Sequence, residues 1–545
     1  MAEVTGAQLV ARQLKLAGID TIFTVLGGPM IEVLAEAQAA GIRVINCRHE
    51  MNACFAASSW GYLNGTAGVA VVASGPAMTN AVTPMYVSTA SAMPLVVLGG
   101  SVAVGSIGLG GFQEANQVAF AQPAAKWVQR VDRAARVPDL VHLALGKAAL
   151  GRPGTAYLDF PGNVVTESVD EDSVRMRTSA PAMTHAQPDS AAIEGIAEML
   201  ATAKRPLVMI GKGAAWADAG EELSRLVERG IPFIASPMGR GTVPDDHELC
   251  VGATRSAAMA GADAVLMVGA RFNWMYQFGS RLPDGVRVAQ IDIEAEEMYG
   301  ASDVEFGVVA DARVAASALN EALEGRALAA ASSGWLDSLS EQGRKNEATL
   351  AEQMTSDQQP VNHYRLLADI RDAIDRDAIV TEDGELTMGV ARQVIPTHVG
   401  KHRFGAGTTG CMGTGFPYAV GAKLAKPETQ VVAVLGDYAF GAAAMEVETC
   451  ARLDIPVVVV VSNNGGIAAH TIQDRYFPAG SDPVAALMQP NYEKMVEMVG
   501  GYSERVTDPA DVRPAVDRAL AAGTIALVNV ITDPEARRAG TSYLG

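Results

Sequence analysis

The apolar positions of this chain gather in short runs that show no alternation between apolar and polar residues. Such runs are typical of strands buried on both faces, as in parallel sheets that helices cover on both sides. Gly, Asn or Asp follows most of them, as expected where a strand passes into a loop and then a helix. The clearest runs are GVAVVAS (68–74), PLVVLGG (94–100), PLVMIG (206–211), AVLMVGA (264–270), RVAQIDI (287–293), VVAVLGD (431–437) and IPVVVVVSNN (455–464). The pattern predicts an α/β protein.

Two polar stretches interrupt this pattern and divide the chain. Residues 171–190 and about 325–360 are poor in apolar runs and rich in Ser, Pro, Gln and charged residues, which is typical of linkers. The 545 residues are also too many for one core, since domains of about 150 residues are the norm. We therefore predict three doubly wound parallel-sheet domains, at 1–170, 190–325 and 358–545.

The composition indicates which binding partners and which cellular compartment to expect. The formal net charge of −19 disfavours nucleic acid and anionic membranes as partners, because both need a basic surface. The five cysteines show no CxxC spacing, as in reduced cytosolic proteins. No signal peptide opens the chain, and its apolar runs are far shorter than the roughly 20 residues of a membrane helix. We expect a cytoplasmic protein that binds small molecules.

Polar residues follow two of the apolar runs near the C-terminus. Asp437 comes directly after VVAVLG, and Asn463 and Asn464 come after IPVVVVVS, one helix and one strand later. A βαβ crossover would bring both strand ends to the same crevice, where ligands bind in open α/β sheets. Carboxylate, amide and carbonyl oxygens suit Mg²⁺, which completes its shell with phosphates and water. Taken singly, the Asp could instead cap a helix and the Asn pair could form a turn.

The joint pattern resembles the thiamine diphosphate enzymes, whose signature is a Gly-Asp pair followed at this distance by an Asn pair. The resemblance implies that Asp437, Asn464 and the carbonyl of Gly466 ligate Mg²⁺. It implies a pyrimidine-binding N-terminal domain, a central nucleotide-binding-like domain and a diphosphate-binding C-terminal domain, with active sites between subunits of a homodimer or homotetramer. Tyr438 departs from the usual Gly or Ser of the signature. The other implied cofactor-binding residues are Leu386, Thr387, Tyr438 and Ala439.

Thiamine chemistry needs a carboxyl group that shares a proton with N1′ of the pyrimidine ring, and an apolar pocket would raise the pKa of that group. Glu50, in VINCRHEMNACFAA, ends a predicted strand and opens a helix, where the helix dipole alone would also favour a Glu. The RHE-x-x-A run resembles the position of the family's catalytic glutamate. In GAGTTGCMGTGFPYAVGA the match places the Gly410 carbonyl on the 4′-amino group and Met412 under the bend of the cofactor.

The middle of the chain shows features of a nucleotide site. Lys212 follows a strand and a Gly turn that could host a phosphate, Arg271 follows the next strand, and Asp292 ends a third, where an acid can bond a ribose hydroxyl. GARFNWMYQFGSRLPDGVRVAQIDIEAEE resembles the 2-hydroxyacyl-CoA lyases and oxalyl-CoA decarboxylases, and the likeness spans nearly the whole chain. It implies an ADP-binding site for coenzyme A formed by Lys212, Arg271, Asp292, Ile293 and Asp311, with Arg152 and Arg240 as weaker candidates.

Two positions depart from the oxalyl-CoA decarboxylases and favour a lyase. Phe112 and Gln113 replace a Tyr-Glu pair, and Ala468, with His470 nearby, replaces a Tyr after the Asn motif. A Gln at this position is typical of lyases and carboligases, and Gln113 and His470 are the candidates for proton handling beside Glu50. The expected reaction cleaves a 2-hydroxyacyl-CoA to formyl-CoA and an aldehyde or ketone, or forms it from them by acyloin condensation. Acyl-CoA and small carbonyl compounds are thus the expected substrates.

Three alternatives stay open at this point. One is an oxalyl-CoA decarboxylase. Another is a CoA-independent acyloin lyase or carboligase resembling benzaldehyde lyase, in which the central domain would be a vestigial nucleotide fold. The third is a non-catalytic thiamine-fold protein or CoA-binding regulator, which the intact Glu50, Asp437 and Asn464 disfavour.

Overall fold

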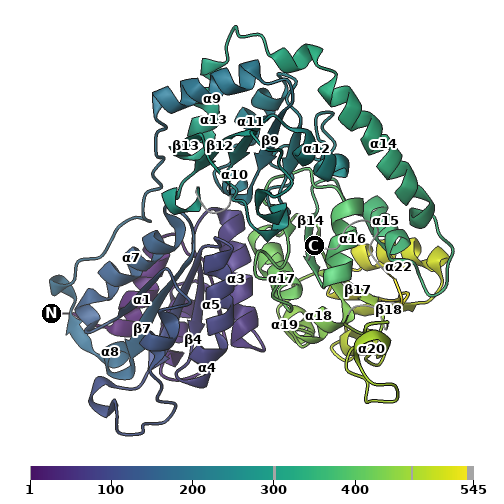
Figure 1. Cartoon of the computed structure of the whole chain (residues 1–545). Coiled ribbons are helices and arrows are strands. Elements are labelled where there is room, and N and C mark those ends of the chain that lie inside the picture. Colours follow the sequence, from purple (N-terminus) through teal and green to yellow (C-terminus); the bar gives the residue numbers. More distant parts are fainter. Residues whose placement is uncertain (1, 299–301, 468–470, 537–545) are drawn as a thin grey trace.

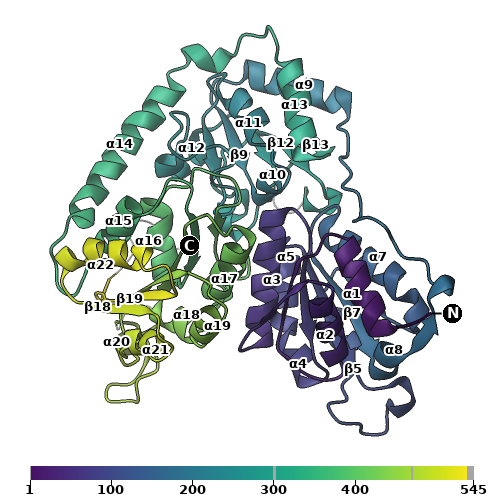
Figure 2. The ribbon, with the colours of Figure 1, turned by 180° about the vertical axis from the view of Figure 1, so that it is seen from behind.

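The computed structural model describes residues 2–298, 302–467 and 471–536. Three α/β units lie at the corners of a triangle (Figure 1), with the N-terminal unit at lower left, the central unit at the top and the C-terminal unit at lower right. The long helix α14 (Trp335–Met354) runs along the outside from the central to the C-terminal unit, as the view from behind also shows (Figure 2). Residues 174–189 join the first two units without a helix or strand.

The N-terminal unit is a six-stranded parallel sheet in the order β3-β2-β4-β5-β7-β6. Its strands are β2 (Thr21–Thr24), β3 (Arg43–Asn46), β4 (Gly68–Val72), β5 (Leu95–Ser101), β6 (Trp127–Arg130) and β7 (Thr155–Pro161). Its helices are α1 (Gly6–Leu16), α2 (Ile31–Ala39), α3 (Glu50–Asn64), α4 (Pro76–Asn80), α5 (Val82–Ala90), α6 (Gln117–Ala121), α7 (Val137–Ala149) and α8 (Gly162–Thr166). A small antiparallel pair, β1 (Glu3–Thr5) with β8 (Ser168–Asp170), ties the start of this unit to its end.

The central unit is a five-stranded parallel sheet in the order β10-β9-β11-β12-β13. The strands are β9 (Pro206–Ile210), β10 (Phe233–Ala235), β11 (Ala264–Val268), β12 (Arg287–Asp292) and β13 (Phe306–Val309). The helices are α9 (Ser190–Thr202), α10 (Lys212–Trp216), α11 (Gly220–Val227), α12 (Arg255–Gly261) and α13 (Ala312–Ala322). The buried faces of β9 and β11 pack against helices on both sides, in two apolar clusters.

The C-terminal unit is a six-stranded parallel sheet in the order β15-β14-β16-β17-β19-β18. The strands are β14 (Ile379–Asp383), β15 (Arg403–Phe404), β16 (Val431–Gly436), β17 (Val458–Asn463), β18 (Tyr502–Val506) and β19 (Ala526–Ile531). The helices are α15 (His363–Ala373), α16 (Glu385–Val394), α17 (Gly415–Ala425), α18 (Asp437–Gly441), α19 (Glu446–Arg452), α20 (Thr471–Tyr476), α21 (Glu493–Glu497) and α22 (Pro509–Ala521). Together the three sheets confirm the predicted α/β class with parallel strands.

The N-terminal and C-terminal units meet along α3 and α17, which lie side by side in both views (Figures 1 and 2). A Cβ atom on Gly421 of α17 would lie only 2.0 Å from the carbonyl oxygen of Ala56 of α3, so only Gly permits this close approach. Ser59 of α3 also donates a hydrogen bond to the carbonyl of Tyr418 at 3.0 Å. The two helices therefore form a tightly packed joint between domains that are far apart in the sequence.

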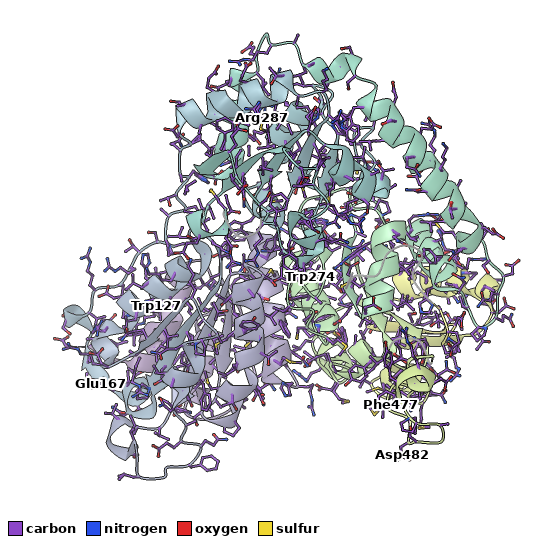
Figure 3. All side chains as sticks on the ribbon, viewed as in Figure 1. Trp127, Glu167, Trp274, Arg287, Phe477 and Asp482 are labelled. Atoms are coloured by element: carbon purple, nitrogen blue, oxygen red, sulfur yellow. The ribbon has the colours of Figure 1, made fainter. Side chains whose placement is uncertain are left out.

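The three units converge around Trp274, which Figure 3 shows near the centre of the molecule. Its indole Nε1 donates to the carbonyl of Thr408 at 2.8 Å and so joins the central unit to the C-terminal unit. Within the described part of the chain, no helix combines the length and the apolar content that crossing a membrane requires.

Candidate active site

The C-terminal sheet brings Asp437 and Asn464 to one edge. Strands β16 and β17 are parallel neighbours, Asp437 opens the helix after β16, and Asn464 directly follows β17. Oδ1 of Asp437 accepts from the backbone N–H of Tyr438 at 2.7 Å, and Oδ2 accepts from that of Gly466 at 3.0 Å. Burial raises the pKa of Asp437, and these backbone N–H groups oppose that rise. The predicted metal-binding segments thus touch one another.

The two residues of the Asn pair have different surroundings. The amide of Asn463 donates to Oδ1 of Asn529 at 3.1 Å and to the carbonyl of Pro490 at 3.3 Å, which holds it within the sheet. Asn464 is buried one residue further on, at the sheet edge beside Asp437. A carboxylate, an amide oxygen and a backbone carbonyl form an all-oxygen donor set, which fits Mg²⁺. Asn464 therefore stands at the position that the sequence assigns to the metal, whereas the amide of Asn463 is held within the sheet.

The turns that would hold a diphosphate also come together. Thr387 is buried in the first turn of α16, and a Cβ atom on Gly436 would lie 3.6 Å from its Oγ1. Leu386, beside it, packs partly against the apolar core. In the first turn of α18, Ala439 is buried and the ring of Tyr438 is exposed, so the large Tyr side chain does not fill this part of the domain.

A buried acid, Asp383, organises the Gly-rich segment. Its Oδ2 accepts from the backbone N–H groups of Thr414 at 2.7 Å and Gly415 at 3.0 Å. Gly410 has a φ of 65°, a left-handed conformation that favours Gly, and Met412 is partly exposed beside it. The acid stands at the end of β14 and fixes the segment that the sequence assigns to the cofactor's pyrimidine and its bend.

Glu50 opens α3 at the carboxyl edge of the N-terminal sheet. Its side chain is half-buried in the single chain, and its Oε2 accepts a hydrogen bond from the amide of Asn80 at 2.9 Å. Gln113 has a φ of 56°, and its Oε1 accepts from the hydroxyl of Ser74 at 3.1 Å. A Cβ atom on Gly75 would lie 2.4 Å from the Gln113 carbonyl oxygen, so Gly is needed where this loop crosses the turn before α4.

Two predicted residues cannot be placed. Ala468 and His470 lie outside the residues that the structure describes. In the described residues no group of three or more His, Cys, Asp and Glu side chains forms a metal site of its own.

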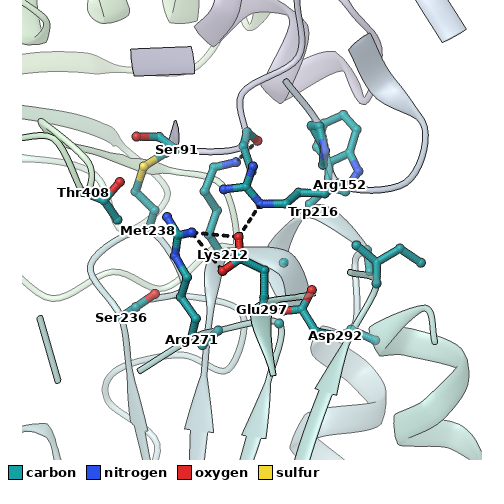
Figure 4. Close-up of a pocket in the computed structure, with 18 of the residues that line it drawn as sticks. Ser91, Arg152, Lys212, Trp216, Ser236, Met238, Arg271, Asp292, Glu297 and Thr408 are labelled. Atoms are coloured by element: carbon teal, nitrogen blue, oxygen red, sulfur yellow. Dashed lines mark hydrogen bonds and ion pairs between the residues drawn. The ribbon is translucent and has the colours of Figure 1, made fainter. Parts of the chain in front are cut away.

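A second site is a pocket where the central unit meets the other two (Figure 4). Glu297 lies between two arginines: Nη1 of Arg271 donates to both of its carboxylate oxygens, at 2.8 and 2.9 Å, and Nε of Arg152 lies 3.2 Å from Oε1. Lys212 enters the same pocket, and Asp292 lines it from the end of β12. Burial raises the pKa of Asp292 to about 6. The pocket thus combines cationic groups, among them Arg152, Lys212 and Arg271, with acids, among them Asp292 and Glu297.

The cations of this pocket also hold the C-terminal end of α5. The carbonyl of Ala90 accepts from Arg152 at 3.0 Å and from Arg271 at 2.9 Å, and the carbonyl of Ala92 accepts from Lys212. Cations are favourable at this end of a helix because of its dipole. Burial lowers the pKa of Lys212 well below its usual range and also lowers that of Arg152, and neighbouring cations add to both shifts.

Six of the seven residues predicted to bind the ADP part of coenzyme A line this pocket: Arg152, Lys212, Arg271, Asp292, Ile293 and Asp311. Arg240 is not among the residues that line it. Its guanidinium pairs with Asp245 at 2.6 Å and donates to the carbonyls of Arg392 and Ile395 at 3.0 and 3.1 Å, so it joins the central unit to the C-terminal unit.

Three family models match the chain in the order of its three units. They describe the N-terminal TPP binding domain (residues 4–120), the central domain (193–319) and the C-terminal TPP binding domain (383–530) of thiamine pyrophosphate enzymes. The chain belongs to the thiamine pyrophosphate enzymes. Thiamine pyrophosphate is the compound called thiamine diphosphate above, and it is the cofactor of this enzyme; Mg²⁺ is typical of the family.

Curated thiamine pyrophosphate enzymes match this one along nearly its whole length. A 2-hydroxyacyl-CoA lyase of Oryza sativa subsp. japonica is 35% identical over 98% of this chain and 96% of its own. An oxalyl-CoA decarboxylase of Escherichia coli strain K12 is 32% identical over 97% of this chain and 95% of its own. A probable acetolactate synthase of Mycobacterium bovis is 35% identical over 97% and 95%. Identity alone does not separate these three activities.

Three residues with prominent roles in this enzyme's sites were absent from the prediction. Asn80 bonds Glu50, Asp383 orders the Gly-rich segment, and Glu297 pairs with both pocket arginines. An acid at the end of an apolar run, as at Asp437, could have pointed to Asp383. Asn80 and Glu297 lie in helical stretches without a distinguishing spacing, so only the folded chain reveals their partners.

Proposed function

We propose that this enzyme is a Mg²⁺-dependent 2-hydroxyacyl-CoA lyase. It cleaves a 2-hydroxyacyl-CoA to formyl-CoA and an aldehyde or ketone, or joins these partners in the reverse direction. The observation that carries the proposal is the central pocket, where Arg152, Lys212 and Arg271 converge with Asp292. Cations suit the phosphates of an adenine nucleotide, and an acid at a strand end suits its ribose. The match to a curated 2-hydroxyacyl-CoA lyase along nearly the whole chain supports the same choice.

In the proposed cofactor site, the C-terminal domain would bind the metal and the diphosphate, and the N-terminal domain would supply the group that shares a proton with the cofactor. Asp437, Asn464 and the Gly466 carbonyl would hold Mg²⁺ and, through it, the diphosphate. Glu50 would share a proton with N1′ of the pyrimidine, and Gln113 would hold the hydroxyl or carbonyl oxygen of the substrate. When bound, thiamine diphosphate supplies the electron sink for breaking the carbon–carbon bond. His470 remains a further candidate for moving protons.

The Gln113 position favours the lyase over the decarboxylase. A neutral amide donates and accepts hydrogen bonds at once, which suits a 2-hydroxyl or a carbonyl oxygen. A carboxylate there, as in the Tyr-Glu pair of the oxalyl-CoA decarboxylases, would accept only. In this chain Gln113 lies against Ser74, and Phe112 next to it is exposed. The departure from the decarboxylase pattern thus falls at the proposed substrate-facing loop.

A second copy of the chain would complete the site. Glu50 is only half-buried here, whereas its proposed role needs apolar surroundings. Large apolar side chains are exposed on the loop that carries Gln113 and around the cofactor-binding turns, which is typical of interaction surfaces. On the loop that carries Gln113 they are Val104, Ile107, Leu109 and Phe112. Around the cofactor-binding turns they are Met412, Tyr438, Met445 and Ile467. A homodimer or homotetramer that pairs these surfaces would bury Glu50 against a cofactor held by the neighbouring subunit.

Product analysis with defined substrates tests the proposal. Enzyme loaded with thiamine diphosphate and Mg²⁺ is incubated with formyl-CoA and a panel of aldehydes and ketones, and 2-hydroxyacyl-CoA is sought by mass spectrometry. Parallel reactions contain oxalyl-CoA alone or pyruvate alone. We expect a 2-hydroxyacyl-CoA from the first mixture. Faster carbon dioxide release from oxalyl-CoA, or acetolactate from pyruvate, would refute the assignment in favour of the corresponding relative's activity.

Thermal shifts with nucleotides separate CoA-dependent from CoA-independent lyases. A ligand at about 100 times its dissociation constant should stabilise the fold by roughly 2.7 kcal/mol. We therefore expect millimolar ADP or CoA to raise the melting temperature. Unchanged melting with both, together with cleavage of a free acyloin such as benzoin, would point to a CoA-independent lyase.

A further inference from the structure

A buried glutamate of the C-terminal unit reaches the start of the helix that carries Glu50. Glu446 opens α19 and is only 1% exposed. Its Oε1 accepts from the backbone N–H of Arg48 at 3.0 Å and from the side-chain amide of Asn52 at 2.8 Å. Its Oε2 accepts from the hydroxyl of Thr449 at 2.7 Å. One carboxylate therefore bonds the chain two residues before Glu50 and two residues after it.

Glu446 bonds the first turn of α3, whereas the contacts with α17 hold the body of that helix. Further along, Ser59 and Ala56 pack tightly against α17 and fix the body of the helix. At its first turn the N-cap His49 supplies one local bond, from the Met51 N–H to its Nδ1 at 3.1 Å. Glu446 adds two bonds around this turn from across the domain boundary, and Nη2 of Arg452 adds a third at the end of β3, to the carbonyl of Asn46 at 2.6 Å.

The same region adjoins the cofactor-binding segments of the C-terminal unit. A Cβ atom on Gly413 would lie 2.9 Å from Cβ of Ala442 and 3.5 Å from Cε of Met51. The Gly-rich segment, the end of α18 and the first turn of α3 therefore meet. Glu446 lies a few residues beyond Ala442, on the chain that leads away from Asp437.

We propose that Glu446 is a positioning residue for Glu50. It fixes the first turn of α3 from the neighbouring domain, so that the carboxyl group of Glu50 is held where it can exchange a proton with the pyrimidine ring. This inference rests on the proposed role of Glu50. It assigns to Glu446 no contact with the substrate or the cofactor. A buried carboxylate that accepts three hydrogen bonds is a rigid support, because each lost bond would leave a buried polar group unpaired.

The rate of hydrogen–deuterium exchange at C2 of bound thiamine diphosphate tests this role. Full-length enzyme loaded with cofactor is mixed with D₂O, quenched with acid and examined by proton NMR, while cofactor affinity and melting temperature are measured alongside. We expect Glu446→Ala to slow the exchange by about 10- to 100-fold, as a displacement of about 1 Å at a reacting group does. Its affinity for thiamine diphosphate should stay within about threefold of the wild type, since its effect reaches the site only through Glu50.

The isosteric variant separates hydrogen bonding from charge. In Glu446→Gln the Oε1 can still accept from Arg48 and Asn52, and the new amide can donate to Thr449. Its exchange rate should therefore stay within about threefold of the wild type. A merely structural role predicts the reverse pattern: Glu446→Ala would melt earlier yet exchange at the wild-type rate, and that result would overturn the proposal. Equal slowing in the Gln and Ala variants would also overturn it, because geometry would then not be the cause.

Asp369 offers a control. It is a half-buried acid of the same unit, on α15, and it accepts a hydrogen bond from Arg365 at 2.9 Å, one turn earlier in the helix. Asp369→Ala should lower the melting temperature and leave the C2 exchange rate unchanged. If Glu446→Ala does not fold, Asn52→Ala removes one of the two bonds from the other side and should slow the exchange to a smaller extent; a wild-type rate there overturns the proposal. Wild-type exchange in Glu50→Gln would instead show that the role of Glu50 is wrong.

Discussion

At the level of single residues, Glu50 has a hydrogen-bond partner that a glutamine could keep. The amide of Asn80 donates to its Oε2, and a Gln side chain can present its carbonyl oxygen at the same place. Glu50→Gln removes only the ability to share a proton. We expect near-normal melting and cofactor affinity, with turnover slowed by about 10²- to 10⁴-fold. Steady-state kinetics with a 2-hydroxyacyl-CoA substrate provide the measurement.

Asn80 supplies the companion variant for that prediction. Asn80→Ala leaves the acid in place but removes the bond that orients it, so activity should fall less than in Glu50→Gln. A Glu50→Gln enzyme with wild-type turnover would show that this carboxyl group takes no part in the chemistry.

Asp292 should make the proposed nucleotide binding depend on pH. Burial raises its pKa to about 6, whereas an unfolded Asp titrates near 4. Between about pH 4 and pH 6 the folded chain therefore binds more protons at this residue than the unfolded chain, and its contribution to stability falls as pH rises. For ligand binding the sign is opposite, because only the ionised carboxylate accepts bonds from both ribose hydroxyls. We expect ADP to bind more tightly at pH 7 than at pH 5.

Isothermal titration at both pH values measures this effect, with Asp292→Asn as the reference. The terminal phosphate of ADP titrates in the same range, but it does so equally for both proteins. The wild type should therefore show a larger gain in affinity between pH 5 and pH 7 than the variant. Equal gains would exclude Asp292 from the ribose contact.

At the level of elements, the joint between α3 and α17 depends on a single glycine. A methyl group on Gly421 would lie 2.0 Å from the carbonyl oxygen of Ala56, so Gly421→Ala must push the two helices apart. Overpacking of this kind costs about 1–3 kcal/mol. Because α3 carries Glu50, turnover should fall together with the melting temperature.

A glycine of another helix provides the control. On α14 a Cβ atom at Gly343 would lie 3.8 Å from its nearest neighbour, an ordinary contact. Gly343→Ala should raise stability by up to about 1 kcal/mol, because Ala is the better helix former. If both variants melt as the wild type does, the close approach of α3 and α17 is not required.

The elements themselves were predictable because their signals are local. The run 431–437 forms β16 followed by Asp437, and the run 455–464 forms β17 followed by Asn464. The rule that parallel neighbours open on one crevice is enough to predict, from the amino-acid sequence, that both residues lie together. The bond between Ser59 and Tyr418 links helices of different domains, and no local pattern encodes such a contact.

At the level of the whole molecule, the domain junction shows what sequence reasoning cannot reach. The Ala90 carbonyl, at the end of α5, receives hydrogen bonds from Arg152 of its own domain and Arg271 of the central domain. Both arginines were predicted to bind the ADP part of coenzyme A, and the structure shows them holding two domains together. Arginine has five N–H donors, so it can bind a ligand and join two domains at once. An Arg in the sequence therefore does not indicate which of these roles it has.

The proposed placement of the active site between subunits leads to the last prediction. If Glu50 of one chain serves the cofactor held by Asp437 of the other, a hybrid dimer of Glu50→Gln and Asp437→Ala chains has one intact site and one site lacking both groups. Co-expression with two affinity tags and tandem purification isolates this hybrid. It should have about half the activity of the wild-type dimer, although each variant alone is inactive.

The reciprocal hybrid, in which one chain carries both substitutions and the other none, should be inactive, because each of its sites then lacks one group. If both residues of a site came from the same chain, the outcomes would be reversed: the first hybrid would be inactive and the second half active. The pair of measurements therefore decides whether the exposed apolar surfaces near Gln113 and Asp437 meet across a subunit boundary.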